Sequence, residues 1–177
     1  MSDHLVGAAG GVVRLERYAE AELREILGDG GDPFGVADVG LSWLAKEVHF
    51  GVRLDGRLVA HAGLLRLPVV VGGVRGEVVG VGGVAVAADV RGQGLARRVV
   101  AAALEHAGTL GPRHGLLFCR EALVPLYERL GWRVVGEDVH VEQGDGTVLM
   151  PLRTMVISLG EATEWPGGGV RLLSFPM

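Results

Sequence analysis

The fold is decided by one stretch of sequence, Val84-Ala85-Val86-Ala87-Ala88-Asp89-Val90-Arg91-Gly92-Gln93-Gly94-Leu95-Ala96-Arg97. It runs from a valine-rich strand through a glycine-bearing turn straight into an amphipathic helix. Backbone N–H groups at such a helix start point into one concavity and attract negative charge. Gly92 and Gly94 let a ligand approach the backbone without meeting a Cβ, and Arg91 and Arg97 add positive charge at the rim. The stretch therefore predicts a site for a phosphate or pyrophosphate.

Three other interpretations of this turn are a Walker loop, a dinucleotide-binding loop and a plain strand–helix connection, and each requires different residues. A Walker loop needs Gly-Lys-Ser or Gly-Lys-Thr, and neither follows the turn. The dinucleotide-binding fingerprint needs a third spaced glycine, which is missing. Both nucleotide-binding classes are therefore disfavoured. A plain strand–helix connection needs only the two glycines, and if these glycines were the whole signal it would be the favoured interpretation.

Hydrophobic patterns on both sides of this stretch predict further strands and helices. The helix that follows the turn is expected to extend from Gly92 to Ala107, with Gly108 as its cap. Asp55-Gly56 is a two-residue turn of the kind that joins antiparallel strands. The predicted strands are 12–17, 48–54, 57–67, 68–71, 78–86, 116–119, 132–135 and 147–158, the last broken by Pro151. The other predicted helices are 19–27, 41–46 and 124–130, with a loop at 28–33.

The order of these elements predicts a mixed α/β sheet. An antiparallel meander comes first, and a strand–helix–strand–helix–strand series follows it. Although the chain has 30 glycines, 49% of its residues are hydrophobic and 21% charged, which is typical of a folded protein. We expect a single domain over residues 1–177, in which the tail at 160–177 has no assigned element.

Composition and charge exclude several functions. The net charge is −4, so a basic surface for nucleic acid is not expected. Because the chain has no long apolar run and no signal peptide at its start, we expect a cytoplasmic protein that crosses no membrane. The single cysteine, Cys119, allows no internal disulfide, and six histidines without metal-ligand spacing predict no metal site. A homodimer through the valine-rich strands is left open.

Two motifs taken together resemble the GNAT superfamily of acyl-CoA-dependent N-acyltransferases. The first is Arg91-x-x-Gly94-x-Ala96, preceded by Gly83-Val84-Ala85-Val86. The second, about thirty residues later, is Leu126-Tyr127-Glu128-Arg129-Leu130-Gly131-Trp132. The predicted elements from Val12 to Val135 follow the order of that fold. The resemblance implies a central, mostly antiparallel sheet with one parallel strand pair, flanked by helices.

The same resemblance implies a cofactor and a catalytic residue. The cofactor is acetyl-CoA, whose pyrophosphate the amides at 92–97 would hold and whose pantetheine arm the strand edge would pair with. Tyr127 matches the family tyrosine that serves as general acid toward the departing thiol. The alternative for Tyr127 is a core aromatic on a short helix. The cofactor-binding residues implied are Val84, Ala85, Val86, Arg91, Gly92, Gln93, Gly94, Leu95, Ala96 and Arg97.

Further likenesses point to an amino-sugar acceptor. Gly83-Val84-Ala85-Val86, Arg91-Gly92-Gln93 and Asp145-Gly146-Thr147-Val148 are similar to the aminoglycoside 2'-N-acetyltransferases. His61-Ala62-Gly63-Leu64-Leu65-Arg66 and Glu164-Trp165-Pro166 look instead like the nodulation-factor N-acyltransferases. Both groups acylate an amine on a sugar. The acceptor-binding residues expected on this basis are Asp38, Gly82, Gly83 and Asp145.

One departure from the aminoglycoside enzymes leaves the general base unassigned. They carry a glutamate directly before the Gly-Val-Ala-Val motif, where this chain has Gly82. The candidates for a base are Glu77, Asp38, Glu47, His49 and His61, and bulk water or backbone carbonyls are the alternative. Arg120 likewise stands where many GNAT proteins carry an asparagine.

We therefore predict an N-acetyltransferase that uses acetyl-CoA and a small-molecule primary amine, such as an aminoglycoside or another amino sugar. The amine is expected to attack the thioester directly, without an acyl-enzyme. Two alternatives remain: a protein or peptide N-acetyltransferase, and a non-catalytic CoA-binding module, which the missing acid at Gly82 favours.

Overall fold

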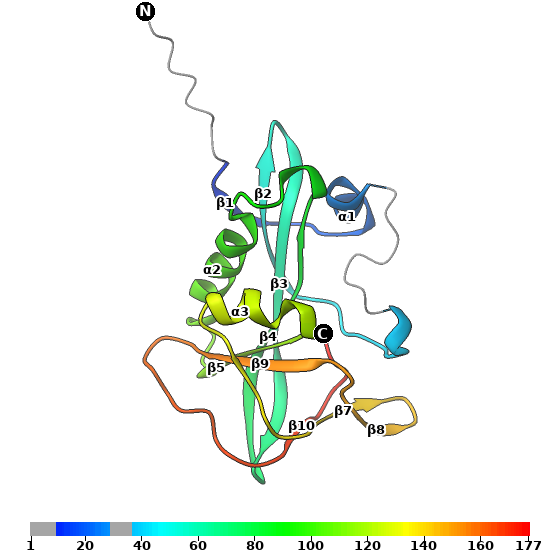
Figure 1. The fold of residues 1–177 in the computed structure, drawn as a ribbon, viewed down its shortest axis with the longest axis vertical. Helices are drawn as coiled ribbons and strands as arrows, with labels where there is room; N and C mark the ends of the chain where they lie inside the picture. Colours follow the sequence, from blue (N-terminus) through cyan, green and yellow to red (C-terminus); the bar gives the residue numbers. More distant parts are fainter. Residues whose placement is uncertain (1–9, 29–36) are drawn as a thin grey trace, which may run out of the picture.

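Two long strands, β3 (Arg57–Val71) and β4 (Val74–Val86), form the hairpin around which the sheet is built (Figure 1). The structure is a computed structural model that describes residues 10–28 and 37–177. Both strands are rich in β-branched side chains, which pack well on a pleated surface. The Gly72-Gly73 turn between them has φ of +55° and +82°, a conformation that suits glycine.

The N-terminal elements agree with their sequence patterns. β1 (Val12–Leu15) pairs with β2 (Val48–Leu54), and helix α1 (Glu20–Leu27) lies between them in the chain. The predicted Asp55-Gly56 turn is confirmed, since it joins β2 to β3 with positive φ at both residues. The loop predicted at 28–33 lies, from residue 29 on, outside the described residues.

The strands predicted at 57–67 and 68–71 form one continuous strand, so the break expected at Pro68 was wrong. Proline lacks an N–H and would normally break a ladder of hydrogen bonds. Here Pro68 lies where β3 changes its outer neighbour from β2 to β10 (Val170–Leu172). At that point the carbonyl of Pro68 still accepts a hydrogen bond from Leu173 N–H at 2.9 Å.

The helix predicted at 41–46 was also wrong, because these residues form no helix and only a 3-10 turn at Ala37–Val39 precedes them. Leu44 N–H donates to the carbonyl of Pro176 at 2.6 Å. Glu47 N–H donates to the carbonyl of Leu64 at 3.0 Å. Hydrogen bonds to distant segments thus override the helical pattern.

The second half of the chain completes a mostly antiparallel sheet, as predicted. It contains helices α2 (Leu95–Ala107) and α3 (Val124–Arg129), 3-10 turns at Ala88–Val90 and Glu121–Leu123, and strands β5 (His114–Cys119), β6 (Arg133–Val134), β7 (Val139–Gln143), β8 (Gly146–Leu149) and β9 (Arg153–Ser158). The strands run in the order β6-β9-β5-β4-β3-β10-β7-β8. The strand predicted at 147–158 is two strands, β8 and β9, separated around Pro151.

The tail, for which the sequence predicted no element, contributes strand β10 between β3 and β7. β10 is antiparallel to β3 and parallel to β7, so the sheet has a second parallel pair besides β4–β5. Gly72 N–H donates to the carbonyl of Gly169 at 3.0 Å. A Cβ at Gly72 would lie 2.3 Å from the carbonyl oxygen of Gly167, so the tail and the hairpin turn touch backbone to backbone.

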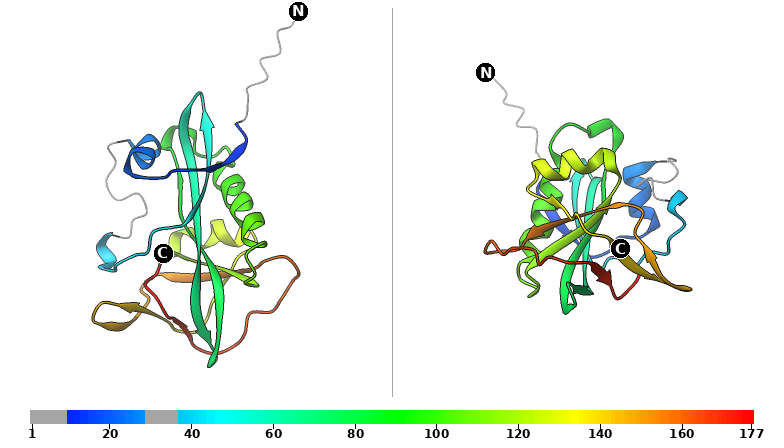
Figure 2. Two further views of the ribbon diagram at one scale, coloured as in Figure 1. Left: turned by 180° about the vertical axis from the view of Figure 1, so that it is seen from behind. Right: turned by 60° about the horizontal axis from the view of Figure 1, so that its bottom comes forward.

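Helices α1 and α2 cover opposite sides of the β3–β4 hairpin (Figure 2). The core divides into two clusters, one beneath these helices and one around β10 and the ends of β3 and β5. Within the described part of the chain, no helix has the length and apolar character needed to cross a bilayer.

The parallel strands β4 and β5 pair over two residues only. Val79 lies opposite Gly115 and Gly80 opposite Leu116, and beyond Gly80 no described strand pairs with that edge of β4. Because β4 continues to Val86, its last residues leave main-chain groups unpaired on the side where β5 diverges.

Candidate active site

The turn after β4 is an open cradle of backbone. Gly92 and Gly94 have φ of +79° and +74°, and a Cβ at either position would meet no atom within 4 Å. The helix predicted from Gly92 therefore begins only at Leu95, because left-handed glycines cannot belong to an α-helix. The first residues of α2, Leu95 to Arg97, line this space, and the first amides of a helix have no partner within the helix.

A first pocket, of about 530 Å³, includes this cradle. We call it the cofactor pocket. Its described lining is Leu27, Val84, Ala85, Val86, Arg91, Gly92, Gly94, Leu95, Ala96, Arg97, Leu123, Leu126 and Tyr127. All the predicted cofactor residues except Gln93, an exposed residue of the turn, contribute to it. A glycine cradle flanked by two arginines fits the pyrophosphate of coenzyme A.

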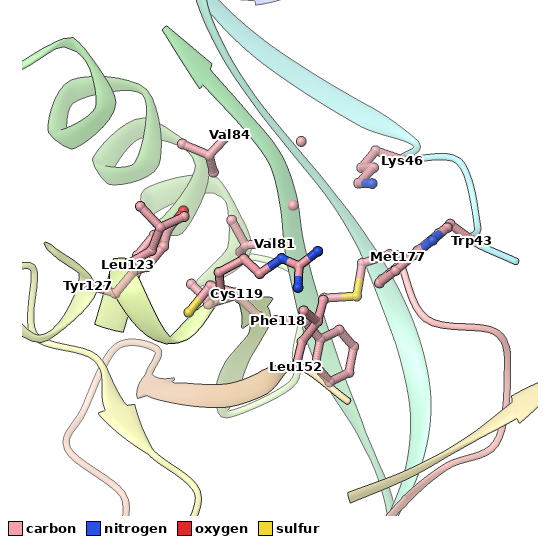
Figure 3. Close-up of a pocket in the computed structure, with 14 residues that line it drawn as sticks. Trp43, Lys46, Val81, Val84, Phe118, Cys119, Leu123, Tyr127, Leu152 and Met177 are labelled. Atoms are coloured by element: carbon pink, nitrogen blue, oxygen red, sulfur yellow. The ribbon is translucent and has the colours of Figure 1, made fainter. Parts of the chain in front are cut away.

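A second pocket, of about 310 Å³, lies where β4 and β5 separate (Figure 3). We call it the acceptor pocket. Val84, Leu123 and Tyr127 line both pockets, so the two cavities meet at these three residues. Most of its walls are apolar, with Trp43, Phe118, Leu152 and Met177 among them.

Tyr127 is held at the junction by the short helix α3. Its ring is 7% exposed and packs edge-on against Trp132, with the ring centroids 6.2 Å apart. Its carbonyl accepts hydrogen bonds from the N–H groups of Leu130 and Trp132, both at 3.0 Å. Burial raises the pKa of the Tyr127 phenol, so Oη keeps its proton and acts as a donor at any ordinary pH.

Cys119 lines the acceptor pocket but is unsuited to a nucleophile. Burial raises the pKa of its thiol to about 11, with Glu121 adding to the effect. Its Sγ lies 3.8 Å from Sδ of Met155. Since the thiolate is the reactive form, this cysteine is a small core residue at neutral pH.

The structure brings together only part of the predicted acceptor set. Gly82 and Gly83 line the acceptor pocket. Asp38 and Asp145 are both exposed and absent from its described lining. Asp38 forms an ion pair with Arg120, which does line the pocket, while Asp145 lies at the turn between β7 and β8.

None of the five candidate bases is in the described lining of the acceptor pocket. Asp38 is the exposed partner of Arg120, and Glu77 lies 3.6 Å from Arg66 at another groove. Glu47 is exposed, and its N–H rather than its side chain contacts β3. The two histidines, His49 and His61, instead belong to a buried network behind β4.

His61 holds a bulge in β4. Between Gly82 and Ala85 the register with β3 shifts, and Gly83 adopts a φ of +61°. Nδ1 of His61 donates to the carbonyl of Gly83 at 2.7 Å, which leaves Nε2 to accept from Nδ1 of His49 at 2.9 Å. The ring of Tyr18 stacks on His61 with centroids 3.5 Å apart. Because bulges re-aim a strand end, this network positions the end of β4 at the pocket.

The His61 network predicts a loss of stability in mild acid. Desolvation by burial lowers the pKa of His61 from 6.5 to about 4 in the folded chain. The unfolded chain binds this proton more tightly than the folded chain does. The free energy of unfolding is therefore highest above pH 6.5, where His61 is neutral in both states, and it falls as the pH decreases toward 4. We expect a decrease of about 3 kcal/mol from this residue across that range.

Urea unfolding at several pH values, with His61→Asn beside the unchanged protein, measures the effect. The variant is less stable at neutral pH but has a shallower pH dependence. Equal slopes for the two proteins would contradict the role given to His61.

Lys46 is a residue of the acceptor pocket that we did not single out from the sequence. It follows the segment wrongly expected to be helical, and its side chain is half-buried. Desolvation lowers its pKa. One signal was available: it is the only lysine in a chain with 16 arginines.

Two adjoining pockets, one of them with a glycine cradle and two arginines, have the arrangement expected of an enzyme that transfers a group from a phosphorylated carrier to a second ligand. A family model described as an acetyltransferase (GNAT) domain matches residues 42–135, more than half of the chain. The chain therefore belongs to the GNAT acetyltransferase family. It is an acyltransferase whose cofactor is acetyl-CoA.

Solved structures agree with this fold. The chain is similar to the GNAT family N-acetyltransferase YhbS of Escherichia coli in complex with CoA, with 21% identity, a TM-score of 0.60, and 93% of this chain and 91% of that chain covered. It is similar to the ribosomal-protein-S18-alanine N-acetyltransferase of Escherichia coli, with 19% identity, a TM-score of 0.56, and 88% and 97% covered. A Brucella melitensis GNAT acetyltransferase in complex with acetyl-CoA matches at 16% identity and a TM-score of 0.54, with 91% and 95% covered. No curated protein sequence matches significantly.

The arginine at the rim of the cofactor pocket leads to a prediction about CoA affinity. Replacing Arg97 by glutamine is expected to weaken CoA binding about tenfold, because a charge-assisted contact to phosphate is lost. Arg24→Gln is the matched control, since Arg24 is exposed on α1 and pairs only with Glu20 among the described residues. Calorimetric titration with CoA measures both. An unchanged dissociation constant for Arg97→Gln would count against this part of the site.

Proposed function

We propose that the protein transfers the acetyl group of acetyl-CoA to a primary amine of a small molecule, by direct attack of the amine. The observation that carries this proposal is the meeting of the two pockets at Tyr127. A pocket of about 310 Å³ matches the size of small-ligand sites. It supports a small-molecule acceptor over a protein surface.

The cofactor pocket orients one reactant. When bound, acetyl-CoA supplies an activated acetyl thioester. The amides at the start of α2 and the arginines Arg91 and Arg97 bind its phosphates, while the unpaired edge of β4 at 84–86 binds its extended arm through main-chain hydrogen bonds. Held by these two contacts, acetyl-CoA would have its thioester near the junction of the two pockets.

Tyr127 serves the departing sulfur. Its phenol stays protonated because burial raises its pKa, so Oη has a proton to donate to a ligand at the junction of the pockets. A donor aimed at developing negative charge accelerates the step in which that charge forms. With Cys119 protonated, an acyl-enzyme on this cysteine is disfavoured.

The acceptor pocket favours a neutral amine. Its described lining has two basic side chains, Lys46 and Arg120, and no acidic side chain. Positive charge and apolar walls both disfavour an ammonium ion and so lower the pKa of the bound amine. This supplies a nucleophile without a carboxylate at Gly82. The aminoglycoside acceptor stays a prediction, and this lining does not favour a polycation.

The test is release of free CoA with a panel of amino acids, simple amines, aminoglycosides and short peptides. The proposal expects turnover with small amines and none above background with peptides. A preference for peptides would replace it by a protein acetyltransferase. No turnover with any amine, although CoA binds, would favour the non-catalytic module.

A further inference from the structure

The acceptor pocket contains a cation, Lys46, that has no acidic side chain beside it among the described residues. Of the two basic residues in the described lining, Arg120 pairs with Asp38. Lys46 has no acidic partner within 4.0 Å among the described residues, and desolvation is the one cause of its lowered pKa. A partly desolvated cation of this kind gains from an anion that arrives with the ligand.

Two facing glycines make room for this lysine. Gly63 of β3 and Gly82 of β4 are partners in the sheet. A Cβ at Gly63 would lie 2.7 Å from Cγ of Lys46, and a Cβ at Gly82 would lie 2.9 Å from its Cε and 3.4 Å from Nζ. The lysine stem therefore lies across both glycines, and Nζ ends where the side chain of residue 82 would begin.

Lys46 and Tyr127 lie on opposite sides of the acceptor pocket (Figure 3). The amine to be acetylated must reach the junction at Tyr127. A second group of the same molecule would then reach toward Lys46 across a pocket whose walls include the apolar side chains of Phe118, Leu152 and Met177.

We propose that the acceptor is a primary amine that also carries a carboxylate and an apolar body, as an amino acid does, and that Lys46 binds the carboxylate. This inference rests on the proposed transfer of acetyl to a small amine. An ammonium in place of the carboxylate would meet the charge of Lys46, so polyamines and aminoglycosides are poor acceptors. Gly82 is then a specificity feature, because it leaves the space that the lysine occupies.

The experiment compares matched acceptors. Phenylalanine, leucine and methionine are each assayed beside the amine that lacks the carboxylate and beside the methyl ester, with kanamycin as the polycation. The unchanged protein is expected to prefer at least one free amino acid over its two neutral counterparts by about 30-fold in kcat/KM.

Three variants separate binding from catalysis. Lys46→Gln is expected to remove the preference, because it raises KM for the amino acid far more than it changes kcat/KM for the neutral amine. Lys46→Arg restores part of the preference. Arg75→Gln, which removes an exposed charge at the far end of β4, is the control and behaves as the unchanged protein.

Product binding is measured as well, in an experiment that does not depend on catalysis. With CoA present, the N-acetylated amino acid is expected to raise the melting temperature of the unchanged protein and not of Lys46→Gln. The inference is overturned if neutral amines or kanamycin are preferred. It is also overturned if Lys46→Gln lowers kcat/KM by the same factor for the amino acid and for its two neutral counterparts, because the preference would then not depend on Lys46. Either result leaves the proposed function intact, whereas no turnover with any amine overturns both.

Discussion

Replacing Tyr127 by phenylalanine is expected to lower kcat about 100-fold, with the affinity for CoA changed less than about twofold. The phenylalanine ring keeps the packing against Trp132, so only the hydroxyl at the junction of the two pockets is lost. Without that donor, the sulfur leaves with its negative charge less stabilised. Steady-state kinetics at saturating acceptor and calorimetric titration with CoA separate the two effects.

Tyr18→Phe is the matched control. Its hydroxyl is buried without a hydrogen-bond partner in the described part of the chain, and its ring stacks on His61 away from both pockets. Loss of this hydroxyl is expected to leave kcat unchanged and to cost no stability, because an unsatisfied polar atom is removed. A kcat for Tyr127→Phe equal to that of Tyr18→Phe would remove Tyr127 from the mechanism.

The second large effect concerns stability. Gly72→Ala is expected to lower the free energy of unfolding by about 4 kcal/mol, as the sum of a strained left-handed alanine and a backbone clash. The new Cβ would lie 2.3 Å from the carbonyl oxygen of Gly167, and φ at this position is +55°. To relieve the clash, the tail must move away from the β3–β4 turn.

Gly73→Ala isolates the clash from the strain. Gly73 has a φ of +82° but nothing within 4 Å of its Cβ position, so only the conformational cost of about 1–2 kcal/mol applies. Urea unfolding of the two variants gives the difference between their free energies of unfolding, provided that the dependence of this free energy on urea concentration is the same for both. Equal stabilities would mean that the contact between turn and tail is not tight in solution.

The parts of this protein that follow from local sequence were predictable. The turn with Gly92 and Gly94 and the tyrosine on a short helix lie within short motifs, and the cofactor pocket contains nearly all residues expected from them. Short sequence motifs suffice to predict the cofactor pocket because its strand, turn and helix start are consecutive in the chain.

The acceptor pocket was not predictable in the same way. Its walls come from segments far apart in sequence, and Gly82 lies opposite Gly63 only because β3 and β4 keep one register from the Val71–Val74 pair to this one. Without that register, the path of Lys46 across both glycines cannot be deduced. The helix expected at 41–46 failed for a related reason, since Leu44 bonds to Pro176.

The tail strand β10 has a consequence for the order in which the site is built. The cofactor pocket is lined by residues 27–127, which are synthesised before the tail. The acceptor pocket needs Met177 in its wall, and Leu44 near it is held by Pro176. The described lining of the cofactor pocket is therefore synthesised before the tail strand, whereas the acceptor pocket lacks one of its walls until the tail is in place.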